Sequence, residues 1–273
     1  MKNFFRNMIR PIIWIGVAPL AGFIFLYLLE ISLKIEFSKQ TSAIVNLIIV
    51  GLIAFLGFPR KLGIPFGKIE TGEFLKRTGF FIPEDYWKHV VLGIILAGCN
   101  LSGILIISIL TGKYILDFSK INVPHLLFCL NPALWEELFF RGVLMVWLLR
   151  NQVPLRRASL IQIGVFSLEN IKGTSLLALF DIFSVMVIAV GFTYVAYKTG
   201  SLLAGIIFHY LYDVFVIFVQ IPGGFVNASL VENFMFYFCL WSTAIIGCLI
   251  IKYFTQKTNI AKKEKNLYTD IDN

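Results

Sequence analysis

Long apolar runs, each ended by a short polar or basic segment, follow one another along the whole chain. A helix that crosses a bilayer needs about 20 predominantly apolar residues. The pattern therefore predicts an all-α, polytopic membrane protein with about eight transmembrane helices. The predicted spans cover residues 11–29, 43–58, 89–111, 124–149, 158–170, 175–197, 201–221 and 234–254. The fifth is too short to cross alone and is expected to be a half-helix shielded by its neighbours.

The composition supports a membrane protein. Hydrophobic residues make up 58% of the chain and charged residues 15%, whereas a soluble domain usually has about 25% charged residues. The net charge of +8 could indicate nucleic acid as a partner. However, the basic residues lie between the apolar runs, which is typical of membrane topology and not of a phosphate-binding face. The expected partner is the lipid bilayer, and no nucleic acid is expected.

The distribution of lysine and arginine orients the chain. Eighteen of the 24 basic residues lie at the two ends and in the loops that share their side, and five lie in the alternate loops. Basic residues are in excess on the cytoplasmic side, so both termini are predicted to be cytoplasmic. The richness in Lys, Ile, Asn and Phe indicates an AT-rich bacterial genome, and therefore an integral protein of a bacterial plasma membrane.

One membrane domain is expected to cover residues 1–273, because no repeat or second domain is visible. The 59–88 loop alternates basic and aromatic residues, which favours a position at the headgroup interface. A role in handling substrate is the alternative for this loop. The tail, residues 256–273, is expected to be disordered.

The fourth span, which contains "NPALWEELFFRGVLMVWLL" (131–149), holds the ionisable residues Glu136, Glu137 and Arg141. A charge at the centre of a membrane helix costs at least ~2.5–3.5 kcal/mol. Glu137 and Arg141 are four residues apart and can pair on one helix face. Glu136 is rotated by about 100° from Glu137 and can point into a cavity.

The seventh span adds His209 and Asp213, also four residues apart. With a rise of ~1.5 Å per residue, Glu136 lies ~20 Å and His209 ~12 Å from the cytoplasmic ends of their spans, and Asn170 falls at a depth between them. A common site at the cytoplasmic ends of three helices is therefore expected. The structural alternatives are a buried ion pair that locks two helices, and hydrogen bonds between helices.

These segments resemble a known family. "EELFFRG" (136–142) is similar to the EExxxR motif, and "HYLYD" (209–213) to the HxxxN/D motif, of the CPBP or Abi family of intramembrane proteases. That family includes the type II CAAX prenyl endopeptidases and bacterial proteins tied to bacteriocin immunity. The resemblance covers roughly residues 85–220 and implies a CAAX prenyl endopeptidase type II-like bundle. "FSLEN" (166–170) fits the family's FxxxH motif, with Asn170 in the place of the histidine.

The resemblance implies roles for these residues. Glu136 would be the general base that activates water, Arg141 would hold Glu137, and His209 and Asp213 would steady the oxyanion. If the site instead holds a metal ion, zinc is the candidate, and its ligands would be Glu136, His209 and Asp213. Asn170 cannot exchange a proton as histidine does and is a poor zinc ligand.

Three functions follow from these observations. The first is an endopeptidase that cleaves a membrane-anchored peptide or protein with Glu136 as base. The second is a catalytically weakened or inactive homologue that serves as a membrane scaffold or bacteriocin-immunity factor, which Asn170 favours. The third is a transporter or channel that uses the polar groups as an ion path, which the lack of inverted repeats disfavours.

Overall fold

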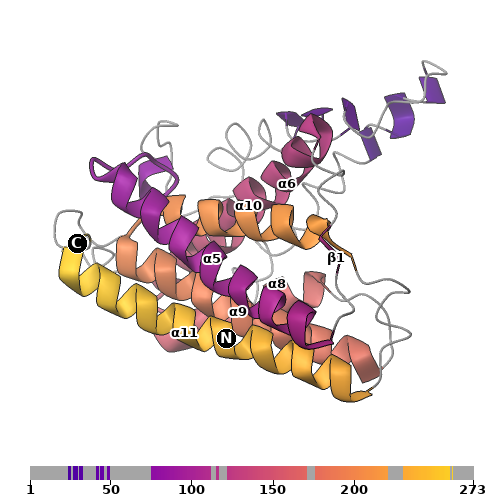
Figure 1. Cartoon of the computed structure of the whole chain (residues 1–273). Helices are drawn as coiled ribbons and strands as arrows, with labels where there is room; N and C mark the ends of the chain where they lie inside the picture. The colour runs from indigo at the N-terminus through magenta and orange to yellow at the C-terminus, as the bar shows by residue number, and fades with distance from the viewer. Residues whose placement is uncertain are drawn as a thin grey trace.

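The computed structural model describes residues 75–111, 115–116, 122–170, 176–220, 230–258 and 260, with scattered helical residues between 24 and 49. The described chain is a bundle of helices (Figure 1). The helices are α5 (Tyr86–Thr111), α6 (Val123–Glu136), η3 (Glu137–Leu144), α7 (Met145–Arg150), α8 (Leu155–Glu169), α9 (Leu176–Thr199), α10 (Leu203–Phe218) and α11 (Leu230–Thr258). The prediction of an all-α membrane protein is confirmed.

The third to eighth predicted spans each correspond to a helical segment. Within the described residues, three helices are long and apolar enough to cross a membrane, at Tyr86–Ile107, Ile182–Thr199 and Phe234–Thr258. Leu203–Phe215 is a shorter apolar helix. The first two predicted spans lie largely outside the described residues, so the count of eight remains a prediction. The tail beyond residue 260 is also outside them, but α11 continues to Thr258, three residues into the segment expected to be disordered.

Helices α6, η3 and α7 follow one another without a break and form one rod, here called the motif helix, from Val123 to Arg150. It begins with Asn122, whose side chain accepts a hydrogen bond from the backbone N–H of His125 at 3.0 Å. The His125 ring contacts the same Asn122 oxygen, at 2.7 Å. Asn122 is therefore the N-cap residue of the helix, a position at which asparagine is favoured. His125 contributes to this cap through its backbone N–H and its ring.

The middle of the motif helix is a π-helix, η3, in which all eight residues are buried. π-helices are rare and often occur at functional sites. The sequence did not predict this change of helix type. The core around it contains aromatic and aliphatic side chains of α8 and α9, which explains why a segment with two charges is covered by protein and not by lipid.

Helices α5, α9 and α11 lie side by side, with α11 in contact with both of the others (Figure 1). Helix α10 packs on α5 and on α6, so it connects this layer to the motif helix. A short antiparallel pair, β1 (Ile115–Leu116) with β2 (Val219–Gln220), joins the segment after α5 to the end of α10. This two-residue pair was not expected from the sequence.

Part of the segment before α5 packs against η3 and the turn before α10. Thr78 is fully buried, and the carbonyl of Gly79 accepts a hydrogen bond from the N–H of Leu202 at 2.9 Å. The space exists because Gly142 of η3 has no side chain: a Cβ there would lie 2.9 Å from the Thr78 carbonyl oxygen. Thr78 and Gly79 are therefore covered by protein, and a position of the segment at the headgroup interface remains a prediction. The exposed Trp87, a few residues later, remains consistent with it.

Candidate active site

A buried ion pair forms the base of the site. Arg141 Nη1 donates to Glu137 Oε1 at 3.1 Å, and both side chains are fully buried. The guanidinium carbon of Arg141 lies 4.2 Å from the ring centroid of Phe166 and 5.0 Å from that of Phe192. The pairing expected from the four-residue spacing is present. The aromatic rings add cation–π contacts that strengthen when water is excluded.

His209 joins the same carboxylate oxygen from α10. Its Nδ1 lies 3.0 Å from Glu137 Oε1. An ionised carboxylate can only accept hydrogen bonds, so Nδ1 must carry the proton of this contact. Glu137 Oε1 thus accepts from Arg141 and from His209 together. This oxygen is one of the contacts that hold the imidazole against the motif helix.

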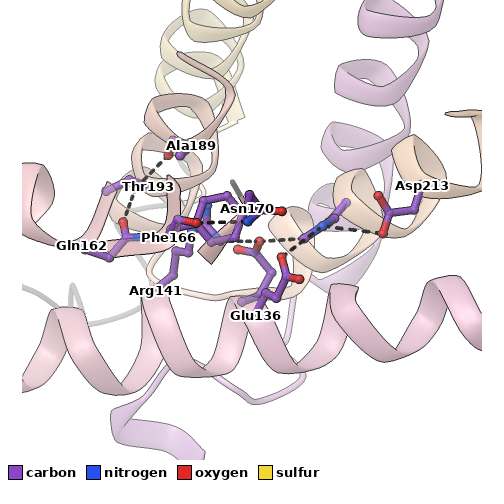
Figure 2. A network of polar contacts seen from close by, with 10 residues as sticks. Glu136, Arg141, Gln162, Phe166, Asn170, Ala189, Thr193 and Asp213 are labelled. Carbon is purple, nitrogen blue, oxygen red and sulfur yellow. Dashed lines mark hydrogen bonds and ion pairs between the residues drawn. The ribbon is translucent and has the colours of Figure 1, made fainter. Parts of the chain in front are cut away.

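The other ring nitrogen of His209 faces two more carboxylates. Nε2 lies 3.7 Å from Glu136 Oε2 and 3.7 Å from Asp213 Oδ2. The side chains of Glu136 and Asp213 are 28% and 25% exposed, whereas that of His209 is 7% exposed. Figure 2 shows Glu136 and Arg141 on the same side of the motif helix. Asp213 lies beyond Glu136, and Phe166 lies next to Arg141. The accessible part of the site is therefore formed by Glu136 and Asp213.

The site contains three carboxylic acids and two basic groups: Glu136, Glu137 and Asp213 with Arg141 and His209. If all five groups are ionised, the cluster carries three negative and two positive charges. The pair of Glu137 and Arg141 is buried and balanced. One further proton, shared near Nε2 of His209, would make the cluster neutral, which suits groups that exchange protons with a substrate.

Asn170 lies at the end of α8, where it caps the helix. Its side-chain amide donates to the carbonyl oxygen of Phe166, one turn earlier, at 3.0 Å. Since the Phe166 ring packs on Arg141, the "FSLEN" segment does lie beside "EELFFRG". A contact across water between Asn170 and Glu136 remains a prediction.

Two features of the site had little or no signal in the sequence. Gly205 precedes His209 by one turn on the same face of α10, and a Cβ on it would lie 3.2 Å from Glu137 Oε2. The four-residue spacing of Gly205, His209 and Asp213 could have revealed this stripe. Phe192 of α9 contacts both Arg141 and His209. No local pattern distinguishes it from the other phenylalanines.

The donor set does not fit a resident metal. Among the residues that the structure describes, no group of three or more His, Cys, Asp or Glu side chains could hold a metal ion. Nδ1 of His209 is already bound to Glu137. Only one imidazole nitrogen is left beside the carboxylates of Glu136 and Asp213, whereas catalytic zinc sites commonly have two or three histidine ligands.

One comparison with known proteins gives a match. Residues 119–215, which contain the motif helix, α8, α9 and most of α10, match the family model described as type II CAAX prenyl endopeptidase Rce1-like. The match covers 97 of the 273 residues and includes the segments whose motifs resemble the CPBP, or Abi, family. This part of the chain is therefore similar to a family of helical membrane proteins. No curated protein and no solved structure matches the chain significantly.

Proposed function

We propose that the protein is an intramembrane endopeptidase that hydrolyses a peptide bond in a membrane-associated peptide or protein, with Glu136 as the base that activates water. The observation that carries this proposal is the position of His209. Its ring joins a buried, balanced ion pair on one side to the partly exposed Glu136 and Asp213 on the other. A general base positioned in this way typically contributes ~10²–10⁴-fold to a rate.

The residues can supply the proton transfers of hydrolysis. Glu136 takes a proton from water as the water oxygen attacks the carbonyl carbon. In its doubly protonated form, His209 donates from Nε2 to the oxyanion, while Nδ1 stays bound to Glu137. The carbon–nitrogen bond then breaks, and Glu136 returns its proton to the leaving amine. Arg141 stays paired with Glu137 throughout, so the position of His209 does not change.

Asn170 supports a second candidate function, a weakened or inactive homologue that acts as a scaffold or immunity factor. Its amide is bonded to the Phe166 carbonyl and so caps a helix. An amide can hold a water molecule but cannot accept its proton. In this case the cluster would stabilise the bundle, and the biological role would depend on a partner in the membrane.

Cleavage of a membrane-anchored peptide library in one lipid preparation separates the two candidates. Glu136→Gln should abolish the cleavage seen with the wild type. Glu84→Gln, which changes an exposed glutamate before α5, is the matched control and should not. Brisk cleavage that survives Glu136→Gln would refute Glu136 as base. Absence of cleavage by every variant, with a cellular phenotype that also survives Glu136→Gln, would favour the scaffold.

Asn170→His provides the complementary prediction. A histidine at this position can accept a proton, which asparagine cannot. We therefore expect slow cleavage by the wild type and a gain for Asn170→His within the ~10²–10⁴-fold range of a general base. The gain should be lost in the double variant with Glu136→Gln. Equal rates for the wild type and Asn170→His would show that this position takes no part in proton transfer.

A further inference from the structure

Phe192 lies at the centre of the contacts between the two basic side chains of the site. Its ring centroid is 5.0 Å from the guanidinium carbon of Arg141 and 4.9 Å from the centroid of the His209 imidazole. The planes of Phe192 and His209 differ by 38°. Phe192 is 2% exposed, so these contacts are dry. Behind it, the ring of Phe208 stacks at 4.6 Å.

Packing contributes to the orientation of these basic groups together with the polar contacts. Arg141 and His209 both bind Glu137 Oε1, and Nε2 of His209 also lies 3.7 Å from Glu136 and from Asp213. Glu137 Oε2 is buried and has no hydrogen-bond partner. The carboxylate therefore does not grip either group with two oxygens, as a bidentate pair would. The ring of Phe192, which packs against both groups, limits how far their planes can rotate.

We propose that Phe192 is a positioning residue, which rests on the proposed function of the same site. The negative face of its ring attracts Arg141 and protonated His209 and holds both against Glu137. This contact keeps Nε2 of His209 directed at Glu136 and Asp213. Phe192 does not touch the reacting atoms, and it acts only through His209 and Arg141.

Two neighbouring phenylalanines provide matched controls. Phe208 stacks on Phe192 and also lines a small hollow beside Leu96 and Asn100, on the other side from the carboxylates. Phe166 packs on Arg141 from α8. If Phe192 positions His209, then Phe192→Leu should disturb the imidazole, while Phe208→Leu should leave it in place. Phe166→Leu should affect Arg141 and leave the His209 ring ordered.

Nuclear magnetic resonance of ¹⁵N-labelled histidine can measure the state of the His209 ring directly. The spectrum is simple because the chain has 3 histidines. The wild type should show one imidazole with a protonated Nδ1 that exchanges slowly with water. His209→Gln should remove this signal and so assign it. Phe192→Leu should increase its exchange with water roughly tenfold, the effect of losing one desolvated cation–π contact. Phe208→Leu should leave the exchange unchanged.

Pentafluorophenylalanine at position 192 keeps the size of the ring and reverses the charge on its face, so it tests the proposal even if Phe192→Leu does not fold. It should also speed the exchange. In active protein, both changes should lower kcat about tenfold or more and leave KM within about twofold, because misplacement affects the transition state most. An unchanged Nδ1 signal in a folded variant at position 192 would overturn the proposal. Cleavage that survives Glu136→Gln would instead overturn the proposed function, and the resonance result would still stand.

Discussion

At the scale of single residues, Glu136 and Glu137 are adjacent but lie in different surroundings. Glu137 is fully buried and pairs with Arg141, whereas the Glu136 side chain is 28% exposed and lies 3.7 Å from the outer nitrogen of His209. Helix geometry separates them, because neighbouring residues point about 100° apart on a regular helix. Under the proposed function, Glu137 would stabilise the fold and Glu136 would take part in the chemistry.

This difference predicts opposite effects of two truncations. Arg141→Ala leaves Glu137 as an uncompensated buried charge, and breaking a buried pair typically costs ~3–5 kcal/mol. Glu136→Ala leaves no orphan charge in the core. Thermal unfolding in detergent should show a large drop for Arg141→Ala and little change for Glu136→Ala. Arg157→Ala, which removes an exposed arginine, is the control. Equal stability of all three variants would contradict this division.

Gly205 provides a second prediction at this scale. A Cβ at this position would lie 3.2 Å from Glu137 Oε2, so Gly205→Ala should push the carboxylate away by a few tenths of an ångström. We expect lower activity, because His209 is bound to the same carboxylate. Gly98→Ala is the matched control, since its Cβ meets nothing within 4 Å. That control should gain about 0.5–1 kcal/mol of stability from its helix position and keep its activity. Full activity of Gly205→Ala would show that the site tolerates the shift.

At the scale of the elements, the sequence predicted the pairs within one helix better than the contacts between helices. The spacing of Glu137 and Arg141 predicted their ion pair, because residues four apart share a face. The estimated depths predicted that Glu136 and His209 lie at a similar level in the membrane. That Glu137 also holds His209 depends on how closely α10 approaches η3, and this approach depends on Gly205. The contribution of Phe192 comes from the packing of α9, which has no local signature.

The fit between η3 and the segment before α5 leads to a prediction for these elements. Gly142→Ala would place a Cβ 2.9 Å from the Thr78 carbonyl oxygen, which is backbone and cannot rotate away. Overpacking of this kind typically costs ~1–3 kcal/mol. We expect a lower unfolding temperature and faster proteolysis before α5. Gly164→Ala, with open space around its Cβ, should show neither. An unchanged unfolding temperature for Gly142→Ala would show that the segment is not held at this point.

At the scale of the whole molecule, the structure brings together segments that the distribution of basic residues predicts to lie on the same side of the membrane. Lys88, at the start of α5, donates to the carbonyl oxygen of Thr258 at the end of α11 at 3.3 Å. The Gly79 carbonyl binds Leu202, at the turn between α9 and α10. The β1–β2 pair joins two segments that are predicted to lie on the opposite side. Which of these two ends faces the cytoplasm is set by the excess of lysine and arginine.

We therefore predict that the end of the bundle with Lys88 and Thr258 is cytoplasmic, together with both termini. A version without the four native cysteines can carry a single new one at either of two exposed positions, Lys257→Cys in the last turn of α11 or Val123→Cys at the start of α6. A membrane-impermeant maleimide should label Val123→Cys in intact cells, because that position lies on the outer side. It should label Lys257→Cys only after the cells are permeabilised. The reverse pattern would invert the predicted topology and show that the excess of lysine and arginine does not mark the cytoplasmic side of this chain.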